Sequence, residues 1–274
     1  MTDLVFPDPQ GYADLATLVR RAHRADPDAA VRLQVTGRVL RVWAGVLPGA
    51  GLLADGAAVG VRGIELADEV GSGSGAGSGS GDGSGASGLD IVCASAALTD
   101  RFAEDGVGAS RLSVPPASRY AAWSGALPAA AGWSAAGSIP AHALIDAARA
   151  GIADIAEGVD ADHTGVAAGS RAVQELRLRV WARPVPITTG DVEAPRANDH
   201  AAANDHAAAN DHAAANDHGG LDSGPAPTAG IPAGAAFAAY VLGFLPDPSA
   251  TVRVWRNGRW VRLQTAAGHV VARP

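Results

Sequence analysis

Lysine is absent from this chain of 274 residues, and all 21 basic residues are arginine. A Walker-type phosphate loop and a protein kinase site each need a lysine that reaches the phosphates. A Schiff-base enzyme needs the lysine amine as its nucleophile. The composition therefore excludes these three classes of enzyme.

Cysteine is nearly absent as well, since Cys93 is the one cysteine. Intrachain disulfides, cysteine-rich zinc sites and CxxC redox motifs all need at least two cysteines, so they are excluded. Cys93 ends the strand-like run 89–93, which favours a small buried hydrophobic residue over a nucleophile.

Long hydrophobic runs are also missing. The longest, residues 231–245, is interrupted by glycine and proline and is too short to cross a hydrocarbon layer of about 30 Å. The first ten residues, MTDLVFPDPQ, have neither the basic region nor the apolar region of a signal peptide. We therefore expect a soluble, cytoplasmic protein with no membrane partner.

Two segments have low complexity. Residues 71–88 are almost entirely glycine and serine, and residues 184–231 contain Asn-Asp-His repeats that begin at 198, 204, 210 and 216. We expect both to be disordered. The sequence then divides into an α+β domain at 1–183, a linker at 184–231, and a helix with a C-terminal hairpin at 232–274 that packs on the same domain.

The repeat does not predict a metal site. On a helix a period of six residues spreads the four histidines over different faces, and on a strand it separates them by about 20 Å. Residues 184–231 also carry a charge of −6 out of a total of −7, so the remaining chain is close to neutral. The overall charge therefore argues against nucleic acid as a partner, and we expect no metal and no cofactor.

The rest of the chain predicts three amphipathic helices. The first begins at Asp8-Pro9 and ends at Asp26-Pro27, the second begins at Pro140, and the third begins at Pro232. Each is followed by an expected strand that carries Arg-Val-Trp, at 41–43, 179–181 and 253–255. These patterns predict an α+β fold in which an antiparallel sheet packs against two or three helices.

Two of these units share a further pattern. Val31-Arg32, Gly37-Arg38 and Arg41 recur with identical spacing as Val252-Arg253, Gly258-Arg259 and Arg262. Duplication of a helix-plus-hairpin unit would produce this match. A chain rich in arginine and valine also produces such matches by coincidence, so both explanations stay open.

The C-terminal hairpin provides the candidate binding site. Asn257-Gly258 predicts a type I′ turn, which would place Trp255 opposite Trp260 with arginines beside them. Stacked tryptophan next to arginine binds planar or charged ligands, and it also stabilises sheets without any ligand. The candidate residues are Arg253, Trp255, Trp260 and Arg262.

Other chemical patterns are weaker. The segment 115–133 concentrates proline, arginine and aromatic residues in a loop that suits contacts with a partner. Acidic residues crowd the end of the second helix, where a solvated helix end explains them better than a cation site. The sequence Gly83-Ser-Gly85-Ala-Ser-Gly88 matches GxGxxG by letter but precedes an expected strand, so it is not a dinucleotide motif.

No motif identifies a function. Our main hypothesis is a non-catalytic binding protein that uses the Trp/Arg hairpin face, with a protein as its partner. The first alternative is an enzyme of unrecognised type that uses His142, His163 or His269 with carboxylates. A second alternative is weak binding of RNA or single-stranded DNA by the hairpin.

Overall fold

The fold is described from a computed structural model, which covers residues 2–67, 88–116, 119–162, 170–188 and 230–274. Most of the two low-complexity segments therefore lies outside the described residues. Within the described part, no helix is both long and apolar enough to cross a membrane.

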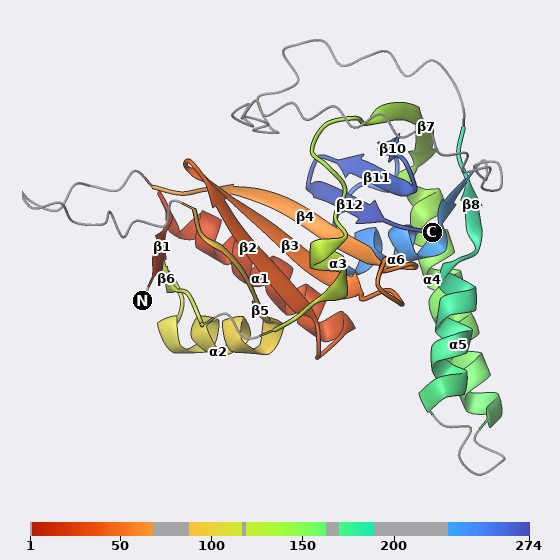
Figure 1. Ribbon diagram of the computed structural model, residues 1–274, viewed down its shortest axis with the longest axis horizontal. Helices are drawn as coiled ribbons and strands as arrows, with labels where there is room; N and C mark the ends of the chain where they lie inside the picture. The colour runs from red at the N-terminus through yellow and green to blue at the C-terminus, as the bar shows by residue number, and fades with distance from the viewer. Residues whose placement is uncertain (1, 68–87, 117–118, 163–169, 189–229) are drawn as a thin grey trace, which may run out of the picture.

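One antiparallel sheet of eight strands forms the centre of the molecule, as the sequence predicted (Figure 1). Its strands, from one edge to the other, are β5 (Asp90–Ala94), β2 (Ala30–Thr36), β3 (Val39–Leu47), β4 (Ala58–Glu65), β12 (Gly268–Ala272), β11 (Trp260–Thr265), β10 (Thr251–Asn257) and β7 (Ser134–Pro140). Two small sheets pair β1 (Asp3–Val5) with β6 (Arg111–Ser113) and β8 (Pro184–Pro186) with β9 (Gly230–Pro232). The flanks of the expected linker are therefore strands.

The described residues include six helices, which confirms the α+β class. They are α1 (Pro9–Ala25), α2 (Ser95–Asp105), α3 (Ala122–Gly125), α4 (Ala141–Asp162), α5 (Ser170–Trp181) and α6 (Ala233–Val241). Helices α1 and α6 lie behind the two halves of the sheet, and α4 and α5 form a pair that extends away from it (Figure 1). The inner face of the sheet packs on helices and forms the main core.

Helix α1 begins and ends where the sequence predicted. The side chain of Asp8 accepts a hydrogen bond of 3.0 Å from the Gly11 amide, and Pro9 occupies the first turn. Leu15, Leu18 and Val19 are buried, as their helical spacing predicts.

Helix α6 is buried mainly through its alanines rather than through Phe237, Tyr240 and Val241, which are half-buried. Small residues let the helix approach the sheet closely. A methyl group on Gly60 of β4 would lie only 2.0 Å from Leu242 Cδ1, at the end of α6. Close approach of small residues, rather than burial of large side chains, therefore packs this helix against the sheet.

The prediction of a strand at 179–181 is wrong, because these residues form the end of helix α5. Leu176, Leu178 and Val180 alternate with arginines, which resembles a strand. In the helix, Val180 is buried while Leu178 is 46% exposed, as helical spacing requires and strand spacing does not. Trp181 stacks on Phe237 of α6 at 4.4 Å between ring centroids, and this tertiary contact fixes the helix.

The expected register of the C-terminal hairpin is also wrong. Asn257 pairs with Trp260, so the two-residue turn is Gly258-Arg259 and Trp255 pairs with Arg262. Gly258 has a φ of 55°, which fits a type II′ turn with glycine first. Because the turn moves by one residue, each pairing shifts by two and every side chain keeps its expected face.

The two units that share the spacing of Val-Arg, Gly-Arg and Arg have the same topology. Each runs helix, strand, strand, strand, as α1-β2-β3-β4 and α6-β10-β11-β12, and the third strands β4 and β12 pair at the centre of the sheet. The turn after β2 is Gly37-Arg38 with a φ of 57° at the glycine, equivalent to Gly258-Arg259. Antiparallel pairing of equivalent strands relates the two units by a local two-fold axis through the middle of the sheet.

Candidate functional site

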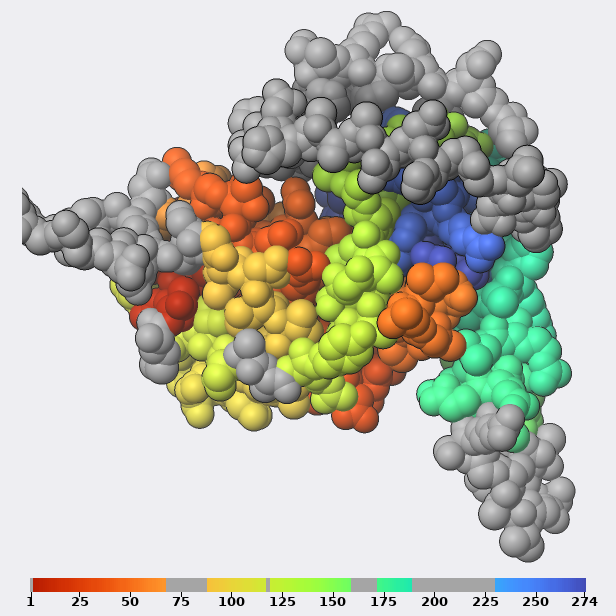
Figure 2. Space-filling model, in the orientation of Figure 1, coloured from red at the N-terminus to blue at the C-terminus, as the bar shows by residue number. Residues whose placement is uncertain are grey.

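The outer face of the sheet, opposite α1 and α6, carries a groove of about 980 Å³. The strands from β2 to β10 form its floor, and residues 124–133 form a wall that crosses the sheet (Figure 1). In Figure 2 this light-green segment lies between the red and orange strands and the blue C-terminal strands. We call this site the Arg/Trp groove, after the lining residues Arg32, Arg41, Trp43, Arg62, Trp133, Arg253, Trp255 and Arg262.

The register of six strands places one continuous row of side chains across this floor. Its members, in order, are Arg32, Trp43, Val61, His269, Gln264 and Arg253. The local two-fold axis passes between Val61 and His269, so Arg32 and Arg253 occupy equivalent ends. At about 4.8 Å per strand the row is about 24 Å long.

A second set of contacts lies beside this row. The guanidinium of Arg262 lies over the rings of Trp133 and Trp255, at 4.7 Å and 5.3 Å from their centroids. Stacking of this kind fixes the position of the charge. Because Arg262 and Trp255 pair across β11 and β10, the strand register and the wall together build this stack.

Trp260 has a different place from the other three candidate residues. Arg253, Trp255 and Arg262 line the groove, whereas Trp260 is 5% exposed and belongs to an apolar cluster on the outer face. The same cluster holds Trp123 of α3, which lies over the sheet. Five of the six tryptophans thus lie on the outer face, and the exception is Trp181.

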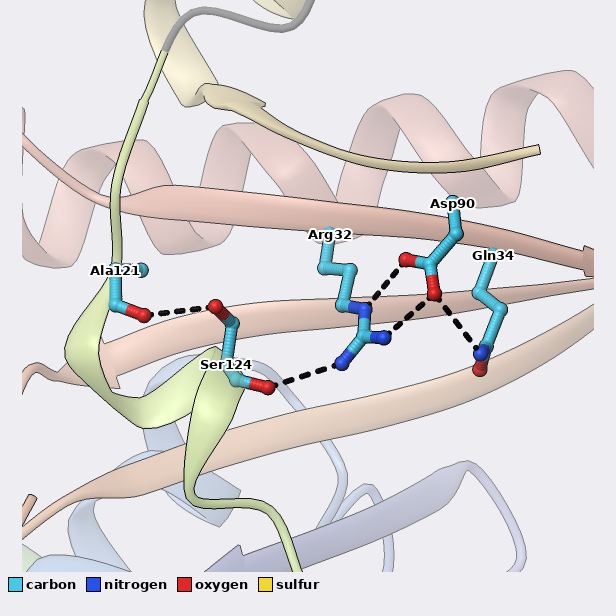
Figure 3. A network of polar contacts seen from close by, with 5 residues as sticks. All are labelled: Arg32, Gln34, Asp90, Ala121 and Ser124. Carbon is cyan, nitrogen blue, oxygen red and sulfur yellow. Dashed lines mark hydrogen bonds and ion pairs between the residues drawn. The ribbon is translucent and has the colours of Figure 1, made fainter. Parts of the chain in front are cut away.

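Arg32 anchors one end of the wall (Figure 3). Its guanidinium donates two hydrogen bonds of 2.6 Å to Asp90 and one of 3.0 Å to the carbonyl of Ser124. The hydrogen bond from Arg32 lowers the pKa of Asp90 below its usual range, against the opposing effect of partial burial. Arg32 therefore links edge strand β5 to α3, which makes it a structural residue of the groove.

Asn257 anchors the other end of the wall. Its side-chain amide donates a hydrogen bond of 2.8 Å to the carbonyl of Ala131. Trp133, two residues further on, donates from Nε1 to the carbonyl of Ala129 at 3.2 Å. The residue that the sequence assigned to the turn therefore holds the wall against the β10–β11 hairpin.

The tryptophans of the floor carry unsatisfied donors. The Nε1 atoms of Trp43 and Trp255 are buried and have no hydrogen-bond partner in the part of the chain that the structure describes. A buried donor without an acceptor costs about 1–3 kcal/mol. Such groups are candidates for contact with a bound acceptor.

The three histidines of the enzyme hypothesis do not share a location. His142 is exposed on α4, His269 lies in the row of the groove, and His163 lies outside the described residues. Within the described residues, no three histidine, cysteine, aspartate or glutamate side chains form a group that could hold a metal. Asp154, part of the acidic helix end, forms an ion pair with Arg183.

Cys93 is fully buried in the main core, and its burial raises the pKa of the thiol to about 12. The segment 115–133, in which the sequence concentrates proline, arginine and aromatic residues, contains both buried and exposed aromatic side chains. Trp123 is 2% exposed, whereas Tyr120 is 81% exposed.

The sequence assigned neither Arg41 nor Trp43 to a site, and it named His269 only for the enzyme alternative and not for the binding face. The spacing match between Arg41 and Arg262 was a signal for one of them, because equivalent positions in two-fold related units share a face. Trp43 and His269 enter through the pairings of β3 with β4 and of β4 with β12. These pairings join segments that are far apart in sequence.

Two family models match parts of the chain. Both describe domains of unknown function, DUF8010 over residues 1–125 and DUF8185 over residues 194–274. The matches contain the first and the second of the two-fold related units, respectively. No curated protein matches the sequence.

Among solved structures, the chain is similar to the C. crescentus beta sliding clamp, with a TM-score of 0.43 and 12% sequence identity. The likeness covers 99% of this chain and 65% of the clamp chain.

Proposed function

We propose that this protein is a non-catalytic binding protein and that it captures a protein partner in the Arg/Trp groove. The observation that carries the proposal is the set of arginine and tryptophan side chains that six strands and the wall gather along one groove. Arginine and tryptophan are the residues most enriched at the energetic centres of protein interfaces. We further propose a cytoplasmic location, which suits a protein whose one cysteine is a buried free thiol.

Removal of groove arginines should abolish capture of the partner. The double variant Arg41→Ala/Arg253→Ala removes one arginine from each two-fold related unit, and both residues line the groove. Affinity capture from the native host should recover a partner with the full chain and lose it at least about tenfold with this variant, since each hydrogen bond to a charged group contributes about 1.5–3 kcal/mol.

The matched control is Arg177→Ala/Arg179→Ala, which removes two exposed arginines from α5. It should retain the partner. Thermal unfolding of each variant shows whether it is folded. Equal recovery of the same partner by the folded groove variant would contradict the proposal. A Trp255→Ala/Trp260→Ala variant is unsuitable, because Trp260 is buried in the outer cluster and its loss destabilises the fold.

A further inference from the structure

The lining of the Arg/Trp groove has a strong excess of donors and positive charge. Five of its described lining residues are arginine, and Glu65 is the one acidic residue among them. Glu65 is itself paired with Arg38 at 2.8 Å. Arg32 is paired with Asp90, and Arg62 is paired with Asp14 of α1 on the opposite face of the sheet. The charge of the groove therefore comes from Arg41, Arg253 and Arg262. Carboxylates and phosphates, which only accept hydrogen bonds from such groups, are the complementary ligands.

The aromatic rings of the groove argue against bases as ligands. Nucleic acids bind single-stranded sites by stacking each base on a free aromatic face. Here Arg262 stacks on both Trp133 and Trp255. The two rings hold the guanidinium of Arg262 in position, and a fixed guanidinium binds an acidic group.

The buried indole donors favour a ligand with acceptors of more than one kind. Trp43 and Trp255 line the groove on opposite sides of the local two-fold axis, and the Nε1 atom of each is buried without a partner in the described part of the chain. A peptide supplies backbone carbonyls for these donors in addition to carboxylates for the arginines.

The length of the row sets the length of the ligand. Arg32 is held by Asp90 and Ser124, so the part of the row that the ligand contacts runs from Trp43 on β3 to Arg253 on β10, which is about 19 Å across five strands. An extended peptide advances about 3.3 Å per residue, so about six residues span this distance.

We propose that the partner binds through an extended acidic segment of about six residues that lies across the strands, with carboxylates on Arg41, Arg253 and Arg262. The inference rests on the proposed function and names the chemistry of the partner at the same site. Carboxylate side chains of the segment pair with the arginines, and its backbone carbonyls accept from Trp43 and Trp255.

The test uses three fluorescent probes on the full chain: an octaglutamate peptide, an octaglutamine peptide and octathymidylate. Fluorescence anisotropy should show octaglutamate bound at least about tenfold more tightly than the other two, because it alone combines carboxylates with a peptide backbone. The variant Arg41→Ala/Arg253→Ala should weaken octaglutamate binding at least about tenfold. The control Arg177→Ala/Arg179→Ala should leave it within about twofold.

A conservative variant tests the indole donor separately from the charge. Trp43→Phe keeps an aromatic ring on the floor and removes the N–H, so octaglutamate should bind several-fold less tightly while its dependence on salt stays unchanged. A purely structural role for Trp43 would leave the affinity unchanged in a folded variant.

Residues 189–229 of the chain itself carry seven acidic residues and one arginine, so they are potential competitors of the probe. The titration is therefore repeated on a full-length variant in which those seven acids are changed to Asn or Gln. The inference is overturned if octaglutamate binds neither the full chain nor the variant without the seven acids. It is also overturned if octathymidylate binds more tightly than octaglutamate. Loss of probe binding with intact, groove-dependent capture of a protein would overturn the inference alone and leave the proposed function standing.

Discussion

At the scale of single residues, arginines on the outer face of the sheet have two different roles. Arg32 is held by Asp90 and the Ser124 carbonyl and positions the wall of the groove. Arg262 is held by two aromatic rings beside the row. Residue type alone does not separate these roles, because the contacts of each arginine decide them.

The pair formed by Arg32 and Asp90 predicts a dependence of stability on pH. The pKa of Asp90 is lower in the folded state than its usual value, so its stabilising effect is full above that value and is lost as pH falls through the folded pKa. Asp90→Asn should lower the free energy of unfolding at pH 7 by up to about 1 kcal/mol, since the carboxylate is 40% exposed. Urea unfolding at a series of pH values should show this difference disappear in acid.

Glu65→Gln is the control for this prediction. Glu65 forms a more exposed pair with Arg38, with side chains 63% and 53% exposed, so its loss should have a smaller effect. A difference for Asp90→Asn that persists unchanged below the folded pKa would show that the carboxylate charge is not the cause.

At the scale of elements, the short helix α3 closes the outer face of the sheet. Trp123 is 2% exposed and packs in the outer cluster, close to the backbone of β3. A methyl group on Gly45 would lie 2.7 Å from Trp123 Nε1, so the glycine makes room for the indole. The packing of Trp123 on β3 therefore holds α3, from which the wall of the groove continues, against the sheet.

Loss of Trp123 should destabilise the protein strongly. Trp123→Ala should lower the free energy of unfolding by about 3–5 kcal/mol, because it leaves a cavity in the outer cluster. Tyr120→Ala, three residues earlier and 81% exposed, should change it by less than about 0.5 kcal/mol. Urea denaturation of both variants distinguishes them, and equal effects would contradict the role assigned to Trp123.

The C-terminal end of helix α5 was predicted as a strand, and the reason lies in its residue pattern. Its alternation of leucine or valine with arginine predicts a strand, while burial of Val180 and the stacking of Trp181 on Phe237 belong to a helix. Isolated periodicity over a few residues is ambiguous. Contact with α6, which comes more than fifty residues later in the chain, resolves it.

At the scale of the whole molecule, the C-terminal segment is part of the central sheet. Strand β12 pairs with β4, and β10 pairs with β7, so three strands from residues 251–272 fill the space between segments of the N-terminal part. Strands β8 and β9, which come before and after residues 189–229 in the chain, pair with each other through Pro186 and Gly230.

A chain that ends at residue 183 should not fold as a monomer. It would expose the edge of β4, remove the partner of β7, and strip α6 from the main core. Size-exclusion chromatography and circular dichroism should show aggregation or the loss of cooperative unfolding.

The control for truncation keeps the C-terminal strands. Replacing residues 189–229 by a short Gly-Ser turn should leave cooperative unfolding intact, because β8 and β9 already bring the two ends together. A monomeric, cooperatively unfolding fragment 1–183 would contradict the structural role of residues 230–274.

The sequence by itself determined the α+β class, the start and end of α1, the face of each residue in the C-terminal hairpin and the buried position of Cys93. These features follow from local patterns: caps, turn glycines and the period of apolar residues. The tertiary structure decided the turn at Gly258-Arg259, the helical state of 179–181, the burial of Trp260 and the assembly of the groove. Each of these depends on pairing or packing between segments that are distant in the chain, and the row from Arg32 to Arg253 exists only because β4 pairs with β12.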